Sequence, residues 1–151
     1  MTVIAWDGRT LASDRLVLYG SMSRVAEKIF IYGDIAYGAA GTYDQVLVFR
    51  QWVALGMPDP IPVLDDLAVI EIELWECYVR DGEHLGVRSK IVGRAECGGI
   101  WAIGCGRELA MGAMLAGKGA REAVRIACLQ DSHCGCLGLE PDAYDLTGLR
   151  T

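Results

Sequence analysis

The sequence opens with Met1-Thr2-Val3-Ile4-Ala5-Trp6, in which a methionine and a threonine precede a short apolar run. The Thr2 side chain is small enough to permit removal of Met1, and the mature chain then begins with a threonine that has a free hydroxyl and a free α-amine. An α-amine has a pKa near about 7.7 to 8.0, so it can act as the base for the hydroxyl nucleophile of the same residue. The opening stretch therefore predicts a strand with a catalytic group at its start.

Such a terminus needs no histidine, but it does need particular neighbours. They must keep the amine neutral, hold the hydroxyl in place and stabilise the oxyanion that forms when a carbonyl is attacked. The alternative interpretation is that Thr2 is an ordinary strand residue, because threonine is common in β-strands. The rest of the sequence has to distinguish these two interpretations.

Three hairpins are predicted from Asp-Gly or Gly-Asp dipeptides, which are strong turn signals between short apolar runs. The first hairpin continues the opening run and turns at Asp7-Gly8, so that Asp14 falls just past its second strand. The second begins with Lys28 and ends in a turn of small residues over 38–42. The strands of the three hairpins are predicted over 3–6 with 10–13, 28–32 with 35–38, and 77–80 with 84–87.

Helices and further strands follow from the spacing of apolar residues. The segment 57–66 carries three prolines within five residues and is predicted to be a connector. Apolar and acidic residues alternate over 67–73, which indicates a half-exposed strand. The remaining predicted elements are a helix over 43–55 that ends at Gly56, a strand over 99–104, helices over 107–116 and 120–130, and a polar tail after 136. Two antiparallel sheets with helices outside them accommodate this order, which predicts an α+β layered fold with a single domain over 1–151.

Composition places the chain among globular proteins and excludes several function classes. Hydrophobic residues make up 52% and charged residues 23% of the 151 residues, which is enough apolar material for one folded core. The net charge is -6, so there is no basic footprint for nucleic acid. The sequence has no leader with a basic and an apolar region and no run long enough to cross a membrane, so we expect a cytoplasmic protein whose six cysteines are thiols.

Six short motifs lie at the ends of the predicted elements. They are Thr2-Val3-Ile4-Ala5, Leu11-Ala12-Ser13-Asp14, Glu27-Lys28-Ile29-Phe30, Gly38-Ala39-Ala40-Gly41, Trp101-Ala102-Ile103-Gly104-Cys105-Gly106 and Asp131-Ser132-His133-Cys134-Gly135. In this order they resemble the peptidase subunits of the proteasome family, namely proteasome β subunits and, more closely, the bacterial HslV-type peptidase. The resemblance covers most of the chain. It implies an N-terminal nucleophile (Ntn) hydrolase with a four-layer αββα sandwich, which hydrolyses peptide bonds as a threonine peptidase.

The resemblance also implies a role for each motif. Thr2 Oγ attacks the carbonyl, and the Thr2 amine accepts the proton once Met1 has been removed. Lys28 places a positive charge beside this amine, and Asp14 pairs with Lys28. The Gly41 amide faces the oxyanion.

Three further sets of residues are carried over from the family. Asp131 holds the α-amine together with Cys105 and Cys134, which stand where the family has serine, and a thiol is a weaker hydrogen-bond donor than a hydroxyl. Ala26, Phe30 and Thr42 fall where the family lines its specificity pocket. The family requires no cofactor, but it suggests Na⁺ or Mg²⁺ on backbone carbonyls, here those of Cys128, Asp131 and Cys134. It further suggests a stacked homo-oligomeric ring, an AAA+ unfoldase partner, and peptides or unfolded proteins as substrates.

Three alternatives stay open. A retained Met1 and the two Ser-to-Cys changes favour a catalytically silent, ring-forming subunit of the same fold. The side chains of Cys97, Cys105, Cys128, His133, Cys134 and Cys136 are possible thiolate and imidazole ligands of a metal, although the Cys-x-Cys spacing differs from the knuckle that zinc sites favour. The third alternative is an amidohydrolase of the same broad superfamily that acts on a small amide.

Overall fold

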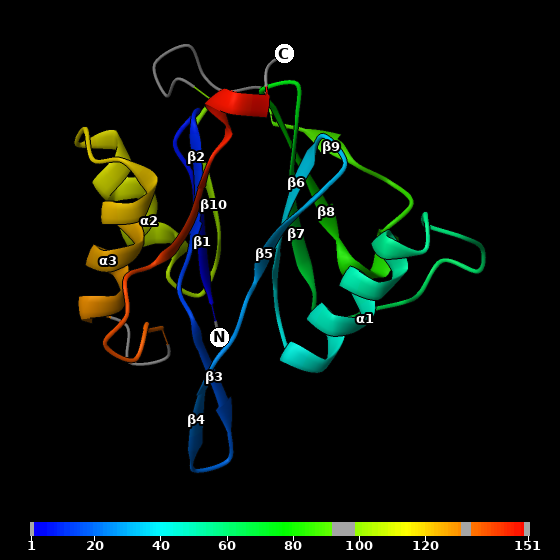
Figure 1. Ribbon diagram of the computed structural model, residues 1–151, viewed down its shortest axis with the longest axis horizontal. Helices are drawn as coiled ribbons and strands as arrows, with labels where there is room; N and C mark the ends of the chain where they lie inside the picture. The colour runs from blue at the N-terminus through cyan, green and yellow to red at the C-terminus, as the bar shows by residue number, and fades with distance from the viewer. Residues whose placement is uncertain (1, 92–98, 131–133, 150–151) are drawn as a thin grey trace.

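The computed structural model describes residues 2–91, 99–130 and 134–149 as a mixed α/β protein with antiparallel sheets and three helices (Figure 1). The first sheet has the strand order β10-β1-β2-β11. Its central strand β1 is completely buried, and Ala5 of β1 pairs with Ala12 on one side and with Ala102 on the other. The strands of this sheet are β1 (Val3–Trp6), β2 (Thr10–Ser13), β10 (Trp101–Gly104) and β11 (Asp142–Asp145).

The second sheet has five antiparallel strands in the order β5-β6-β7-β8-β9. Strand β6 runs beside β5 and β7, and the polypeptide leaves its end to enter the first helix. The strands are β5 (Ile29–Tyr32), β6 (Ile35–Ala40), β7 (Ala68–Glu73), β8 (Glu76–Asp81) and β9 (Ser89–Lys90).

Each sheet has helices against its outer face, and the two sheets share an apolar core between them (Figure 1). Helices α2 (Arg107–Leu115) and α3 (Ala120–Gln130) pack small side chains against β1 and β2. Helix α1 (Tyr43–Ala54) packs Phe49 against the second sheet. Ile4 of β1 and Ile70 of β7 belong to the cluster between the sheets. This arrangement buries the start of β1 within the molecule.

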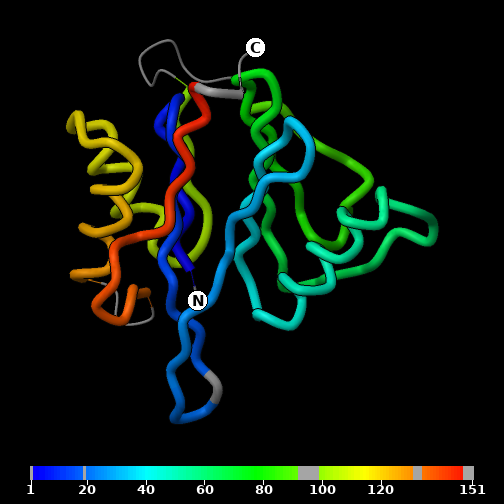
Figure 2. Tube along the Cα trace, in the orientation of Figure 1, coloured from blue at the N-terminus to red at the C-terminus, as the bar shows by residue number. Residues whose placement is uncertain are grey.

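A two-stranded hairpin, β3 (Leu16–Tyr19) with β4 (Met22–Val25), extends away from the rest of the chain, as Figure 2 shows. Short 3-10 helices follow β8 at Gly82–His84 and β11 at Leu146–Leu149. No helix among the described residues is long and apolar enough to reach across a bilayer.

Several predicted elements are confirmed, although α1 and α2 each end one residue before the predicted end. The first hairpin occupies the predicted residues, and its turn is held by the Asp7 carboxylate, which accepts the Thr10 amide at 2.7 Å. The second Asp7 oxygen accepts the Ala120 amide at 2.8 Å, so the same side chain joins the turn to the start of α3. All three helices begin where they were predicted, and the connector after α1 contains neither helix nor strand.

The third predicted hairpin is wrong. Strands β7 and β8 are joined at Leu74 and Trp75, both of which have positive φ, and the partner that follows β8 is the short strand β9. The Asp81-Gly82 dipeptide begins a 3-10 helix because the Asp81 carboxylate accepts the Glu83 amide at 2.9 Å. Asp81 therefore caps the start of this 3-10 helix, at the position where the sequence predicted a hairpin turn.

The strand predicted over 67–73 is confirmed as β7, but its predicted half-exposed face is wrong. Strand β7 is interior to its sheet, and Glu71 is completely buried. The Arg80 guanidinium donates to both Glu71 carboxylate oxygens, at 2.8 and 3.0 Å, and Arg88 lies 3.4 Å away on the same group. The positive charges of Arg80 and Arg88 compensate the carboxylate, so Glu71 can lie on a buried face of the sheet.

Several strands were missed by the sequence analysis. The hairpin β3–β4 was not predicted, and the predicted polar tail supplies strand β11 at the edge of the first sheet. The predicted turn of small residues over 38–42 is shorter than expected, because β6 continues to Ala40.

Candidate active site

Thr2 lies immediately before β1 and is buried, with 2% of its surface exposed. Its carbonyl oxygen accepts hydrogen bonds from the Cys105 thiol at 3.3 Å and from the Gly106 amide at 3.4 Å. Gly104 has a φ of +95°, and a Cβ at this position would lie 2.0 Å from the same oxygen. A glycine is therefore needed at the end of β10 for the Thr2 backbone to approach so closely.

Asp14 and Lys28 form a buried ion pair beside the start of β1. The Lys28 ammonium lies 3.0 and 3.1 Å from the two carboxylate oxygens of Asp14. The amides of Val3 and Gly135 donate to the same carboxylate, each at 3.1 Å. Asp14 thereby joins Lys28 to the first amide of β1 and to the loop after α3.

The pKa of the Asp14 carboxyl is raised from its ordinary value of 3.8. Burial is the largest cause and raises the pKa, whereas the Lys28 charge and the hydrogen bonds from Lys28, Val3 and Gly135 lower it. The ionised carboxylate therefore depends on Lys28 to offset the loss of water.

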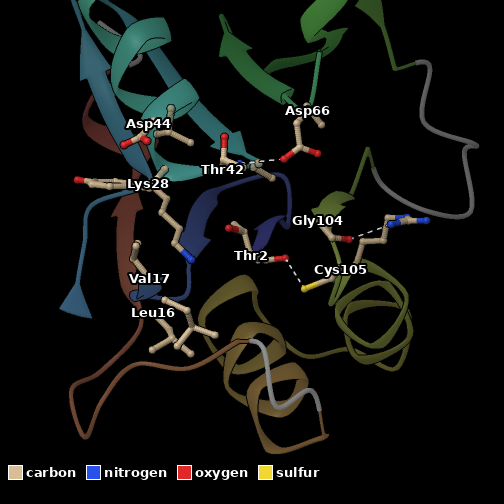
Figure 3. A pocket seen from close by; sticks show the side chains of 16 residues that line it. Thr2, Leu16, Val17, Lys28, Thr42, Asp44, Asp66, Gly104 and Cys105 are labelled. Atoms are coloured by element: carbon tan, nitrogen blue, oxygen red, sulfur yellow. Dashed lines mark hydrogen bonds between the residues drawn. The ribbon is translucent and has the colours of Figure 1, made fainter. Parts of the chain in front are cut away.

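Thr2 and Lys28 line one pocket of about 670 Å³, together with Gly41, Thr42, Gly104 and Cys105. In Figure 3 the Lys28 side chain extends toward Thr2 from the residue that precedes β5, and Cys105 approaches Thr2 from the opposite side. Leu16 and Val17 of β3 form an apolar part of the wall, and Asp44 and Asp66 also line the pocket. The first strand, the second hairpin and the β10–α2 junction thus meet around one cavity.

The turn after β6 presents Gly41 to this pocket. Gly41 has a φ of +154°, and a Cβ there would lie 2.3 Å from the Asp66 carbonyl oxygen. The Asp66 carboxylate accepts the Thr42 amide at 3.2 Å and holds the same turn (Figure 3). This position therefore requires glycine both for its backbone conformation and for its close neighbour.

Of the three predicted specificity-pocket residues, Thr42 lines the cavity. Ala26 and Phe30 are buried and do not belong to its lining among the described residues. Phe30 belongs to the core under α1, where its ring stacks on Tyr37 at 5.3 Å. Leu16 and Val17 were missed as lining residues, although the apolar run that ends at Gly20 is a signal for a strand and turn.

Four described cysteines lie in two pairs near the site. The Cys105 and Cys134 sulfurs are 3.3 Å apart, with Cys105 exposed and Cys134 buried. Cys128 and Cys136 are hydrogen-bonded to each other. This hydrogen bond is the largest cause that lowers the pKa of the Cys136 thiol to about 7, and it raises the pKa of Cys128 together with burial.

Several predicted ligands cannot be placed, because Asp131, His133 and Cys97 lie outside the described residues. Cys128 lies in the last turn of α3 and Cys134 follows that helix, so the predicted set of three carbonyls is only partly described. Among the described residues, three ligand atoms come within 4.8 Å of one another only in the exposed group Asp81, Glu83 and His84. The described cysteines therefore give no support to a thiolate metal centre.

Comparison with solved structures supports a proteasome/HslV-type fold. The BPH protein of Thiobacillus denitrificans in complex with epoxomicin superposes with a TM-score of 0.69 and 18% identity, and the match covers 95% of this chain and 97% of that one. A second structure of Thiobacillus denitrificans BPH gives the same TM-score and identity, with 95% of each chain covered. The eukaryotic HslV of Trypanosoma brucei gives a TM-score of 0.60 and 21% identity, over 95% of this chain and 97% of that one. No protein-family model and no curated protein sequence matches the chain.

Proposed function

We propose that this protein is a proteasome-like threonine endopeptidase of the Ntn-hydrolase type, with a four-layer αββα sandwich and with Thr2 as its nucleophile after removal of Met1. The observation that carries the proposal is the pocket in which Thr2, Lys28 and Gly41 meet, with Lys28 paired to the buried Asp14. The likeness of the fold to BPH and HslV supports a hydrolase of this kind.

The reaction begins with attack of Thr2 Oγ on the peptide carbonyl. The free α-amine of Thr2 takes the hydroxyl proton, directly or through one water, and later returns it to the leaving amine. The product of this first half is an ester between Thr2 and the acyl part of the substrate. A water activated by the same amine then attacks the ester and releases the second product, which restores the free threonine.

Lys28 and Gly41 stabilise this sequence electrostatically. A positive charge in the same pocket disfavours the protonated form of the α-amine and so keeps the base available near neutral pH. The Gly41 amide stabilises the oxyanion of the tetrahedral intermediate. Burying an ion pair seldom stabilises a fold by itself, so the presence of Asp14 and Lys28 beside Thr2 is better explained by chemistry than by folding.

Cys105 and Cys134 stand where the family has serine, and together with Asp131 they are proposed to hold the α-amine. The Cys105 thiol donates to the Thr2 carbonyl, which positions the backbone of the nucleophile. Because a thiol is a weak donor, we expect the amine to be held less firmly than by a hydroxyl.

The proposed assembly is a stacked homo-oligomeric ring in the cytoplasm that degrades peptides or unfolded proteins, with an AAA+ unfoldase as a possible partner class. No cofactor is required for the proposed steps. Na⁺ or Mg²⁺ on the carbonyls of Cys128, Asp131 and Cys134 stays a prediction, for which metal analysis of dialysed protein is the test.

Intact mass and peptide hydrolysis test the function together. We expect the purified protein to lack Met1 and to cleave small fluorogenic peptides, and we expect Thr2→Ala to abolish cleavage with an unchanged circular dichroism spectrum. Epoxomicin provides a second probe, because it is present in the BPH complex. Its binding, measured as a shift in melting temperature, should be lost in Thr2→Ala. Equal hydrolysis rates for the two proteins would remove Thr2 as the nucleophile.

One observation favours a second candidate, a catalytically silent subunit of the same fold. The Cys105 and Cys134 sulfurs lie in contact with each other, in a position where the family has two hydroxyls. Absence of hydrolysis by protein that lacks Met1, with the assembly retained, would favour this candidate. Recovery of hydrolysis in the Cys105→Ser, Cys134→Ser double variant would then identify the thiols as the cause.

A further inference from the structure

Cys105 and Cys134 bring two thiols into direct contact at the wall of the Thr2 pocket. Their sulfur atoms are 3.3 Å apart, although the residues are 29 positions apart in the sequence. Cys105 follows β10, is exposed and lines the pocket, whereas Cys134 is 5% exposed and packs in the core beneath α2 and α3. The Cys105 thiol is thus open to solvent, and the Cys134 thiol is buried in contact with it.

We propose that Cys105 and Cys134 are a disulfide-forming site, at which a peroxide-class oxidant converts the two thiols into a covalent link beside Thr2. A disulfide has its sulfurs about 2.05 Å apart, so the observed contact has to shorten by roughly 1.3 Å. Rotation of the exposed Cys105 side chain and a small shift of the junction between β10 and α2 can supply this movement.

The chemistry takes two steps and balances with one peroxide. The Cys105 sulfur, as thiolate, attacks the O–O bond, which breaks to give a sulfenic acid on Cys105 and an alcohol, or water when the oxidant is hydrogen peroxide. The Cys134 sulfur then attacks the Cys105 sulfur, the S–S bond forms, and the hydroxyl leaves as water. The two thiols supply two electrons and the peroxide receives them. A dithiol reductant such as dithiothreitol reverses the link by donating two electrons and two protons.

The consequence for Thr2 follows from the hydrogen bond that the reaction removes, and this part of the inference rests on the proposed function. Cys105 donates its S–H to the Thr2 carbonyl at 3.3 Å, and a disulfide sulfur has no proton to donate. The link also joins the β10–α2 junction to the loop whose Gly135 amide binds Asp14. Oxidation therefore changes the groups on both sides of the nucleophile, and we expect it to inhibit peptide hydrolysis.

Cys128 and Cys136 are the rival pair, because they are also hydrogen-bonded to each other. The Cys136→Ser variant removes this rival and leaves Cys105 and Cys134 in place. Cys105→Ser and Cys134→Ser each remove one half of the proposed link with nearly the same side-chain shape. Circular dichroism of each variant establishes that it is folded before it is compared.

The test is peptide mapping under non-reducing conditions after treatment of the full chain with hydrogen peroxide. We expect wild type and Cys136→Ser to lose two hydrogens in mass and to yield a peptide that links Cys105 to Cys134, and dithiothreitol to remove it. Cys105→Ser and Cys134→Ser should not yield this peptide. A link only between Cys128 and Cys136, or only sulfinic acid on Cys105, would overturn the inference.

Peptidase activity is measured on the same samples and separates the two proposals. If reduced wild type hydrolyses peptides, peroxide should abolish this activity, dithiothreitol should restore it, and Cys105→Ser should keep whatever activity it has after peroxide. If the Cys105–Cys134 disulfide does not form, the proposed disulfide site is overturned and the proposed peptidase function is unaffected. Failure of reduced protein to hydrolyse peptides overturns the proposed function, while the mapped link still decides the inference about the thiols.

Discussion

At the scale of single residues, the Asp14–Lys28 ion pair is costly to bury, and backbone hydrogen bonds stabilise it in addition to the attraction between the two charges. Both side chains are buried, and two backbone amides donate to the carboxylate. Each of these donors replaces part of the water that Asp14 loses. Removing Lys28 leaves a carboxylate that two amides cannot neutralise.

We therefore expect Lys28→Met to lower the free energy of unfolding at pH 7 by roughly 3 to 5 kcal/mol, as for other broken buried pairs. Without the Lys28 charge, the pKa of Asp14 rises further above 3.8, because burial then acts with less opposition. A raised pKa in the folded state stabilises the fold below the unfolded pKa, and this stabilisation is lost as pH rises through the folded pKa. The deficit of Lys28→Met should shrink as pH falls toward 4, as urea denaturation at several pH values will measure.

The matched control for this prediction is Lys90→Met, which removes an exposed lysine paired with Glu76. Exposed pairs contribute little to stability, so Lys90→Met should change the urea midpoint far less than Lys28→Met. Equal effects of the two substitutions would mean that burial of the Asp14 pair carries no special cost.

Cys136 offers a separate prediction at the residue scale. The hydrogen bond with Cys128 is the largest cause that lowers the pKa of Cys136 from its ordinary 9.0 to about 7. We expect the rate of Cys136 alkylation by iodoacetamide, followed by peptide mass spectrometry, to rise with pH with a midpoint near 7. Cys128→Ala removes the donor and should move this midpoint toward 9.0. An unchanged midpoint would show that Cys128 does not stabilise the Cys136 thiolate.

At the scale of elements, the junction between β10 and α2 positions Thr2 by backbone contact. Gly104 has no side chain where the Thr2 carbonyl passes, and the next two residues donate hydrogen bonds to that oxygen. The Arg107 guanidinium donates to the Gly104 carbonyl at 3.0 Å, which fixes the same turn. A Cβ added at Gly104 should therefore displace Thr2.

Gly104→Ala and Gly56→Ala make a matched pair for this prediction. The two glycines have φ of +95° and +85°, and an added Cβ meets nothing within 4 Å at Gly56 but lies 2.0 Å from the Thr2 oxygen at Gly104. Both variants should lose about 1 to 2 kcal/mol from the unfavourable backbone conformation. Gly104→Ala should lose roughly 1 to 3 kcal/mol more from overlap, measured by thermal or urea denaturation. Equal losses would contradict the close approach of Thr2.

The same elements show how far sequence reasoning reaches. Local signals predicted the first hairpin and the three helices, because turn dipeptides and helical spacing act over a few residues. Strand β11 has the polar sequence Asp-Ala-Tyr-Asp, and it becomes a strand only through pairing of Ala143 with Ala12. Glu71 was assigned to a solvent face because Arg80, its partner, lies on the neighbouring strand.

The candidate site likewise contains residues that sequence motifs predicted and contacts that only the folded structure reveals. Motif order gave Thr2, Asp14, Lys28 and Gly41 as site residues, and the structure brings Thr2, Lys28 and Gly41 to one pocket with Asp14 bound to Lys28. The family resemblance assigned Cys105 to the Thr2 amine, whereas the structure shows its thiol on the Thr2 carbonyl. This contact joins residues 103 positions apart and depends on the pairing of β1 with β10. No local pattern contains that information, nor the burial of Phe30 beneath α1.

At the scale of the whole molecule, the pocket is made where the two sheets and the β3–β4 hairpin meet. Leu16, Val17 and Leu18 of β3 line the pocket, while the tip of the hairpin extends away from the body (Figure 2). Leu18, Met22 and Val25 are 44%, 54% and 48% exposed. An isolated two-stranded hairpin is marginally stable in water, so its exposed apolar side chains need a cover.

We expect a second copy of the chain to provide this cover in the proposed ring, which makes the hairpin the element that couples assembly to the pocket. Wild type should then exceed the monomer mass of 16.4 kDa in light scattering after size exclusion. Met22→Glu places a charge in the apolar contact and should shift the protein toward monomer and lower peptide hydrolysis together. Val63→Glu, at an exposed position of the connector after α1, should leave the mass unchanged. A monomeric wild type, or a Met22→Glu protein of unaltered mass, would mean that the hairpin is not part of a contact between copies.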